Sequence, residues 1–311
     1  MQMESDSMAR ATIRSKILPF FTTALQTYQS SSQTFAVLCS IPSATHGELA
    51  PPSPPSPPRS LLVLDSSFNP PTVAHGRMVL SALRDHKYKE SSRVLLLLAI
   101  NNADKAPQPA AFPQRLAMMH ILADDLLSRA AQLGSACSGV DIAVTTEPYF
   151  HNKSAAVRDS GFYHHYNAQT PKEHRHQTEQ IYLTGFDTLI RIFNAKYYPG
   201  EAMSSVLDPF FAHSSLRVTM RTDANWGDAE EQKAYLDGLG RGGKLDEMGG
   251  RKEWVEKIEM TPGREEGEDV VSSTKVRDAV QSKDWDGLSS LTSPAVAEWV
   301  RDHELYACGN K

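Results

Sequence analysis

Residues 61–78 read LLVLDSSFNPPTVAHGRM, and this segment predicts a buried strand, a rigid turn and the entry to a helix. Its first part, LLVLDS (residues 61–66), is a short apolar run that ends in small polar residues, as expected of a strand buried in a parallel sheet. Asn69, Pro70 and Pro71 favour a turn because the prolines restrict the backbone. Residues 77–86 then have the pattern of a helix.

The alternation of strand and helix continues to the end of the chain. Strand-like runs occupy residues 93–100, 140–146, 180–185, 216–220 and 257–260, and helical patterns occupy residues 112–129, 188–194, 273–281 and 294–303. Such alternation is typical of right-handed βαβ units. The sequence therefore predicts an α/β fold: a Rossmann-like open parallel sheet with helices on both faces and a C-terminal helical segment.

The first 58 residues differ from the rest of the chain in composition. Residues 13–28 predict a helix that contains Pro19, and residues 51–58 read PPSPPSPP, which favours an extended polyproline II conformation. A spacer is the preferred interpretation of this tract, and a ligand for a protein partner of the SH3 or WW type is the alternative. We therefore expect an N-terminal helical extension and Pro-rich linker in residues 1–58, and the α/β domain in residues 59–311.

Two polar segments, residues 148–178 and 237–252, are predicted to be surface loops. The histidines of the first segment match no defined metal-site spacing, so no bound metal is expected. They are His151, His164, His165, His174 and His176. The second segment contains GLGRGGKL, which satisfies the GxxxxGK pattern of a Walker A loop. However, Leu245 stands where that loop requires Ser or Thr, so we set the match aside.

Composition limits the function and the location of the protein. The net charge of −5 argues against a general nucleic-acid binder, which needs a concentrated basic face. No apolar run approaches the roughly 20 residues that cross a bilayer, and Cys39, Cys137 and Cys308 form no CxxC pair. These features predict no membrane association and a cytoplasmic or nuclear location. A mitochondrial presequence is less favoured because Glu4 and Asp6 precede the basic residues of the first helix.

Polar residues that follow the strands are candidate ligand-binding residues, because open parallel sheets bind ligands beyond the carboxyl ends of their strands. Thr72 and His75 stand three residues apart at a helix entry, where both can face a phosphate. Gly185 allows a ligand to approach the backbone, and Asp187 can accept hydrogen bonds from ribose hydroxyls. The alternative is that Thr72 and Asp187 only cap helices.

Residues 270–280 read VVSSTKVRDAV and predict a second phosphate site at the start of a helix. Backbone amides and the hydroxyls of Ser272, Ser273 and Thr274 can surround phosphate oxygens, and Arg277 lies one helical turn further on. The alternative is an ordinary helix cap with a solvated arginine.

These segments resemble known motifs. FNPPTVAH is similar to the (H/T)xGH signature of the nucleotidyltransferase superfamily, although Ser66 and Ala74 stand where glycine is usual. VVSSTKVR resembles the ISSTxxR motif of the same superfamily, and GFDTL resembles its GxDxL segment. Within the superfamily, residues 59–306 look most like eukaryotic nicotinamide mononucleotide adenylyltransferases, and in particular like a divergent fungal branch, the promoter-of-filamentation-like proteins.

The resemblance implies the nucleotidyltransferase fold and a reaction of ATP with nicotinamide or nicotinate mononucleotide that yields a dinucleotide and pyrophosphate. It also implies Mg²⁺ carried by the phosphates of ATP. The catalytic residues that it implies are His75, Thr72 and Arg277. The implied ATP-binding residues are Ser67, Phe68, His75, Gly185, Asp187, Ser273, Thr274 and Arg277. The implied mononucleotide-binding residues are Asn69, Lys105, Arg115, Thr146 and Arg221.

The resemblance departs from the family pattern at the expected pyridine site. Family enzymes commonly stack the pyridine ring on a tryptophan after the third strand, whereas this chain has Thr146 near that position and Tyr149 or Phe150 as substitutes. The alternative function is therefore an ATP-binding or weakly ATP-hydrolysing regulatory relative that has lost the pyridine site. Transfer to another phosphorylated acceptor is a further alternative.

Overall fold

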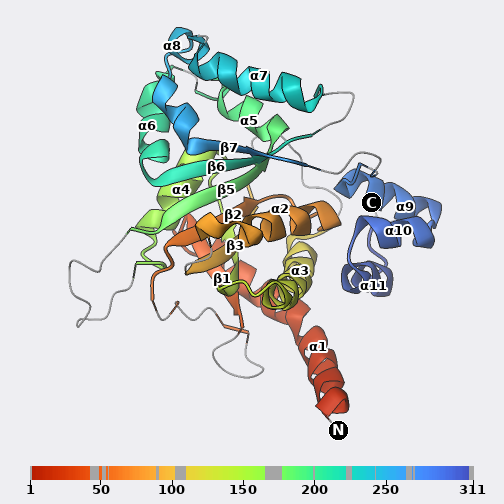
Figure 1. The fold of residues 1–311 in the computed structure, drawn as a ribbon. Coiled ribbons are helices and arrows are strands. Elements are labelled where there is room, and N and C mark those ends of the chain that lie inside the picture. The colour runs from red at the N-terminus through yellow and green to blue at the C-terminus, as the bar shows by residue number, and fades with distance from the viewer. Residues whose placement is uncertain are drawn as a thin grey trace.

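The computed structural model contains a seven-stranded sheet (Figure 1). It describes residues 2–42, 49–50, 54, 56–88, 91–101, 110–164, 177–198, 200–221, 226–241, 243–263, 268 and 270–307. The strands are β1 (Phe35–Ile41), β2 (Ser60–Asp65), β3 (Ser92–Ala99), β4 (Cys137–Thr145), β5 (Glu179–Gly185), β6 (Ser214–Thr219) and β7 (Ile258–Thr261). Their order is β1-β4-β3-β2-β5-β6-β7, and only the β1–β4 pair is antiparallel. The predicted parallel sheet is confirmed, with an antiparallel strand added at one edge.

Helices cover both faces of the sheet. Successive side chains of each strand point to opposite faces, and because the side chains on both faces are apolar, each face packs against helices. Leu62 and Leu64 of β2 pack with α1, α2, α3 and the C-terminal helices, whereas Leu61 and Val63 pack with α4, α5 and α6. The α-helices are α1 (Gln2–Gln29), α2 (Val73–Arg84), α3 (Phe112–Gln132), α4 (Phe150–Asp159), α5 (Phe186–Ile192), α6 (Met203–His213), α7 (Ala229–Gly240), α8 (Lys244–Glu247), α9 (Ser273–Ser282), α10 (Trp285–Leu291) and α11 (Pro294–Asp302). Short 3₁₀ helices are η1 (His86–Tyr88), η3 (Ala195–Tyr197) and η4 (Lys252–Lys257). The predicted C-terminal helical segment is therefore confirmed, and Figure 1 shows α9, α10 and α11 gathered at one side of the molecule.

Strand β2 lies where the strand order reverses. From β2 the chain builds outward through β3 to β4, and it then returns to the other side of β2 for β5, β6 and β7. In parallel sheets of this kind the reversal opens a crevice outside the carboxyl ends of the two central strands. Those ends are Asp65 of β2 and Gly185 of β5.

The N-terminal segment contributes to the sheet and to its core. β1 pairs with β4, and α1 packs against α3. Ile17, Phe21 and Leu25 of α1 are buried in the same cluster as the strands. Elements on both sides of residue 58 therefore share one sheet and one core. The helix predicted over residues 13–28 is longer than expected, and strand β1 was not predicted.

Some segments predicted as loops are helical, so those predictions are wrong. α4 lies within residues 148–178, and the end of α7, α8 and the start of η4 lie within residues 237–252. Helix α4 lacks an obvious apolar stripe because Lys153 and Ser154 are among its buried residues. In the second segment, Leu239 and Leu245 are buried in the core. The burial of Leu245 also agrees with setting aside the Walker A match.

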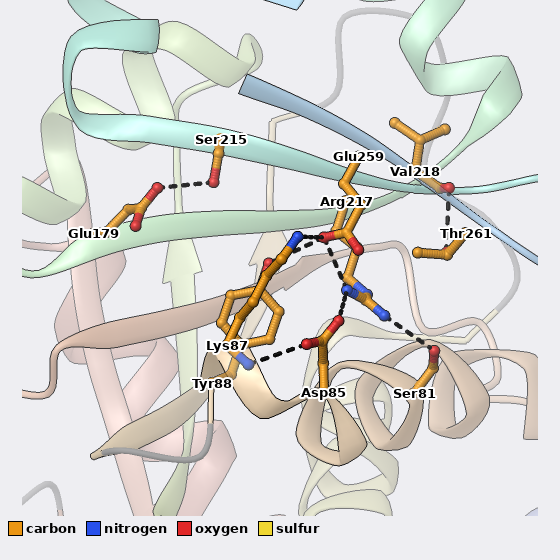
Figure 2. Close-up of polar contacts among 10 residues, drawn as sticks. All are labelled: Ser81, Asp85, Lys87, Tyr88, Glu179, Ser215, Arg217, Val218, Glu259 and Thr261. Carbon is orange, nitrogen blue, oxygen red and sulfur yellow. Dashed lines mark hydrogen bonds and ion pairs between the residues drawn. The ribbon is translucent and has the colours of Figure 1, made fainter. Parts of the chain in front are cut away.

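A buried ion-pair cluster fastens the end of α2 to the outer strands (Figure 2). Arg217 of β6 has a side chain 8% exposed, and its Nη1 lies 2.9 Å from Asp85 Oδ2 and 3.0 Å from Glu259 Oε2. Asp85 immediately follows α2, and Glu259 belongs to β7. Because α2 starts at the carboxyl end of β2, this cluster secures the helix at its other end.

A second buried cluster joins β1, β3 and β4. Arg93 Nε and Nη2 each donate a hydrogen bond of 2.6 Å to the carboxylate of Asp141. The same carboxylate accepts hydrogen bonds from Ser40 Oγ at 2.6 Å and from the Tyr163 hydroxyl at 2.8 Å. These four hydrogen bonds stabilise the negative charge of the Asp141 carboxylate, which is fully buried.

Candidate active site

The turn after β2 arranges Thr72 and His75 at the start of α2. Phe68 adopts a left-handed backbone conformation (φ 44°) and buries its ring, which lies 5.3 Å from the His75 ring. Thr72 is the N-cap residue of α2. Its backbone N–H donates to His75 Nδ1 at 3.0 Å, and its Oγ1 lies 2.8 Å from the same nitrogen. The two signature residues therefore form one hydrogen-bonded unit at a helix N-terminus, where anions are favoured.

The imidazole of His75 is neutral in this environment. Burial of the ring lowers the pKa of His75 to about 4. Since Nδ1 accepts the Thr72 N–H, the network assigns the ring proton to Nε2, which lies 2.9 Å from Ser66 Oγ. Nε2 can therefore donate a hydrogen bond to an oxygen beyond the end of β2. This contact was not predicted, because Ser66 was noted only as a residue that replaces the usual glycine.

Helix α9 brings the second phosphate motif to the same turn. Ser273 Oγ donates to the carbonyl oxygen of Pro70 at 2.8 Å, across 203 positions of sequence. Arg277 Nη1 donates to the Asn69 carbonyl oxygen at 2.8 Å, and Nη2 donates to Thr274 Oγ1 at 3.1 Å. The structure therefore brings Ser273, Thr274 and Arg277 together with the turn that contains Asn69.

Further side chains from the end of the chain complete this junction. The Tyr306 hydroxyl donates to Asn69 Oδ1 at 2.8 Å, and Thr292 Oγ1 donates to the Pro71 carbonyl oxygen at 2.8 Å. Arg115 lies close enough to Tyr306 and Arg277 to interact with both electrostatically, and burial lowers the pKa of Arg115. Its Nε donates to the Ala110 carbonyl oxygen at 2.8 Å. The contacts of Tyr306 and Thr292 were not predicted, because nothing local in the sequence marks them.

A second group of predicted residues lies at the ends of β5 and β6. Asp187, in the first turn of α5, forms an ion pair of 3.2 Å with Arg221. A Cβ atom at Gly185 would lie 2.7 Å from Asp187 Oδ1, so a larger residue there would require this carboxylate to shift. The buried Gln232 of α7 holds the Arg221 backbone by accepting from its N–H at 3.0 Å. Gly185, Asp187 and Arg221 are thus neighbours.

Thr146 lies apart from these groups, at the end of β4. Its backbone N–H donates to the Thr34 carbonyl oxygen at 3.1 Å, and it lies beside Tyr28 of α1. Two aromatic residues follow it and differ in their surroundings. Phe150 packs edge-on against the core ring of Tyr182 at 5.5 Å. Because Thr34 and Tyr28 both contact Thr146, the N-terminal segment forms one wall at this end of the sheet.

Tyr149 instead belongs to a partly buried aromatic group. Its ring is parallel to His151 at a centroid distance of 5.7 Å and edge-on to Tyr197 at 6.4 Å. Of the two substitutes considered for the missing tryptophan, Tyr149 is the one outside the core.

The remaining predicted residues lie elsewhere. Ser67 is exposed beside the turn, and Lys105 lies outside the described residues, as do His165, His174 and His176. His151 belongs to α4 rather than to a loop. Among the described residues, no group of three or more His, Cys, Asp or Glu side chains is placed to hold a metal ion. None of the described helices is long and apolar enough to span a bilayer.

Comparisons with known proteins agree with the motifs. No family model matches the chain. A Schizosaccharomyces pombe protein named "Putative nicotinamide mononucleotide adenylyltransferase" is 36% identical over 226 residues, which cover 73% of this chain and 78% of that protein.

Solved structures give weaker similarities. A Plasmodium falciparum nicotinic acid mononucleotide adenylyltransferase complexed with NaAD matches with 13% identity and a TM-score of 0.46, over 80% of this chain and 97% of that one. Thermotoga maritima TmcAL bound with alpha-thio ATP matches with 13% identity and a TM-score of 0.39, over 79% and 56%. The family assignment therefore rests on the Schizosaccharomyces pombe relative. The chain belongs to the nicotinamide mononucleotide adenylyltransferase family.

Proposed function

We propose that this protein transfers the adenylyl group of ATP to nicotinamide or nicotinate mononucleotide, forming NAD or deamido-NAD and pyrophosphate. Family membership supports the choice of substrates. The observation that carries the proposal is the hydrogen-bonded junction between the two phosphate motifs, in which Ser273 and Arg277 contact the backbone of Pro70 and Asn69. Two motifs about 200 residues apart in the chain converge there, beside the carboxyl ends of β2 and β5.

The proposed reaction is a direct displacement. An oxygen of the mononucleotide phosphate attacks the α-phosphorus of ATP, and the bond from this phosphorus to the bridging oxygen breaks, so that its electron pair leaves with pyrophosphate. No protein nucleophile is needed, and catalysis consists of alignment and of stabilising the charge of the phosphate oxygens. The neutral His75 suits this task, because Nε2–H can exchange Ser66 Oγ for a phosphate oxygen without a change of charge.

The other donors divide between the ends of ATP. We assign Thr72 to the reacting phosphates together with His75, and Ser273, Thr274 and Arg277 to the leaving pyrophosphate. The planar guanidinium of Arg277 has more donors than its contacts with the Asn69 carbonyl oxygen and Thr274 Oγ1 use. Gly185 and Asp187 would receive the adenosine, with Ser67 and the backbone of Phe68 beside its phosphates.

The acceptor would lie toward the ends of β3 and β4. Asn69, Lys105, Arg115 and Thr146 are proposed to contact the mononucleotide there. Arg221, which pairs with Asp187 at the ends of β5 and β6, would contact it from the side of the ATP. Tyr149 is proposed to stack on the pyridine ring, since Phe150 is occupied by core packing with Tyr182. Aromatic stacking of this kind accommodates either the amide or the carboxylate form of the ring.

Mg²⁺ is proposed to enter as part of the ATP complex. The side chains around the turn are hydroxyls, a neutral imidazole and a guanidinium, which suit phosphate oxygens rather than a resident cation. Bound to the phosphates, the ion would neutralise part of their charge.

The deciding experiment incubates purified protein with ATP, Mg²⁺ and each mononucleotide, and it measures dinucleotide and pyrophosphate. His75→Ala should lower the rate about 100-fold to 1000-fold, the usual effect of removing one positioned donor. Turnover equal to wild type in this variant would refute the site. If ATP binds but neither acceptor gives dinucleotide, the chain is instead the ATP-binding regulatory relative.

Location and protein partners are also proposals. A cytoplasmic or nuclear location is supported by the free thiols of Cys39 and Cys137, which suit a reducing compartment. A partner that binds the proline tract of residues 51–58 is supported by its composition alone.

A further inference from the structure

A buried ion pair lies at the end of β2, one residue before the Ser66 that contacts His75. Lys153 Nζ of α4 lies 2.5 Å from Asp65 Oδ2, and their side chains are 6% and 10% exposed. Asp65 is the last residue of β2 and immediately precedes Ser66, whose hydroxyl contacts His75. Neither charged residue belongs to the candidate site residues described above.

The position of this pair in the sheet is unusual. By the alternation of side chains, Asp65 shares a face with Leu61 and Val63, which belong to the apolar core. Burying two charges there costs free energy that their attraction only partly offsets. A well-packed apolar pair would serve stability as well, so the ion pair calls for an explanation other than stability.

The neighbourhood of the pair is polar on the β5 side as well. Val63 of β2 pairs with Tyr182 of β5, so the next residues on that face are Asp65 and Thr184. The hydroxyl of Thr184 is buried and has no hydrogen-bond partner among the described residues. Asp65 also contributes to raising the pKa of Tyr182, after burial, which is the larger cause. The ion pair is therefore the charged centre of a polar region at the strand reversal.

Helix α4 is held on the sheet by a row of polar contacts. Ser154 Oγ lies 2.8 Å from Ser214 Oγ of β6, and the Ser154 carbonyl oxygen accepts from Gln180 Nε2 of β5 at 3.0 Å. Lys153 adds the contact to β2. The first turn of the helix follows Tyr149, the proposed ring contact. The three contacts thus fix where Tyr149 stands relative to the end of β2.

We propose that Lys153 and Asp65 are positioning residues that couple the acceptor site to the phosphate site. Lys153 fixes the start of α4, and Asp65 ties it to the strand end that leads into Ser66 and His75. This assignment rests on the proposed function. Without the pair, Tyr149, the proposed contact of the pyridine ring, is no longer held in a fixed position relative to the reacting phosphates. ATP keeps its own contacts at α2 and α9.

The test measures KM for each substrate in Lys153→Met, Asp65→Asn and the double variant Asp65→Asn/Lys153→Met. We expect KM for the mononucleotide to rise on the order of tenfold in each, with KM for ATP within about twofold of wild type, because a small misplacement of one reactant is costly. Removing both charges relieves the unpaired charge, so the double variant should recover stability but not acceptor affinity. It also keeps the test valid if a single variant fails to fold.

Two further variants separate positioning from general stability. Lys153→Arg retains the charge and should restore most of the acceptor affinity. Arg217→Met removes another buried cation, at the far end of α2, and should reduce stability with both KM values unchanged. No dinucleotide from the wild-type protein would overturn the proposed function and this assignment with it. An active wild-type enzyme whose folded double variant keeps the wild-type KM for the mononucleotide would overturn the assignment alone.

Discussion

At the scale of single residues, the protonation state of His75 decides how the site can work. Its pKa of about 4 lies below the value of about 6.5 expected in the unfolded chain, because burial disfavours the charged ring. Between these pH values the unfolded chain binds the additional proton, so stability falls as the pH falls. The contribution of His75 to stability is therefore complete above pH 6.5 and is lost progressively toward pH 4.

Nuclear magnetic resonance of the histidine rings measures the protonation state of His75 directly. We expect the His75 ring to remain neutral at pH 5.5, with the proton on Nε2, and His75→Gln identifies its signal. A titration midpoint near 6.5 would contradict the neutral donor. Urea unfolding from pH 7 to pH 4.5 should show a smaller loss of unfolding free energy in His75→Gln than in wild type.

The positions of the candidate residues in the fold were predictable where their signal is local. Thr72 and His75 stand at a helix start and Arg277 one turn into a helix, so spacing alone brings these side chains toward a helix N-terminus. Ser66 and Tyr306 were not predictable, since their roles depend on contacts formed by folding. The Tyr306 contact with Asn69 spans 237 positions.

At the scale of elements, parallel strands were the easiest to predict. They are buried on both faces, so they appear in the sequence as continuous apolar runs. Helix α4 was missed because it buries Lys153 and Ser154 against the sheet and so lacks an apolar stripe. Strand β1 was missed although FAVLCSI (residues 35–41) is also an apolar run, because it lies between the N-terminal helix and the proline tract, outside the alternation of strand and helix that marked the other strands.

The junction of β1, β3 and β4 yields a prediction about stability. Asp141→Asn removes the charge that Arg93 requires, and the guanidinium is then buried without a counter-ion. We expect the free energy of unfolding to fall by about 3–5 kcal/mol, as for other broken buried pairs. Urea denaturation measures this change. The double variant Arg93→Met/Asp141→Leu should recover part of the loss, and a single variant as stable as wild type would contradict the network.

At the scale of the whole molecule, the N-terminal helix α1 joins separate parts of the fold. α1 packs its apolar side on α3, and Arg14 forms an ion pair of 2.7 Å with Glu298 of α11. The helix therefore contacts one element from the middle of the chain and one from its end. The end of α1 also places Tyr28 beside Thr146, next to the proposed acceptor site. A substitution in the packed face of α1 should therefore change the free energy of unfolding without changing KM for either substrate.

Phe21→Ala separates the two contributions. The Phe21 ring is fully buried and lies 6.4 Å from the His120 ring of α3. Its removal leaves a cavity between α1 and α3, so the free energy of unfolding should fall by about 3–5 kcal/mol. The exposed Thr23, two residues away, provides the matched control, and Thr23→Ala should change stability by less than about 0.5 kcal/mol. Because Phe21 packs on α3 about two helical turns before Tyr28, the folded variant should keep the wild-type KM for both substrates at low temperature. Equal stability of the two variants would mean that α1 does not belong to the core, whereas a raised KM for the mononucleotide would mean that its packing extends to the acceptor site.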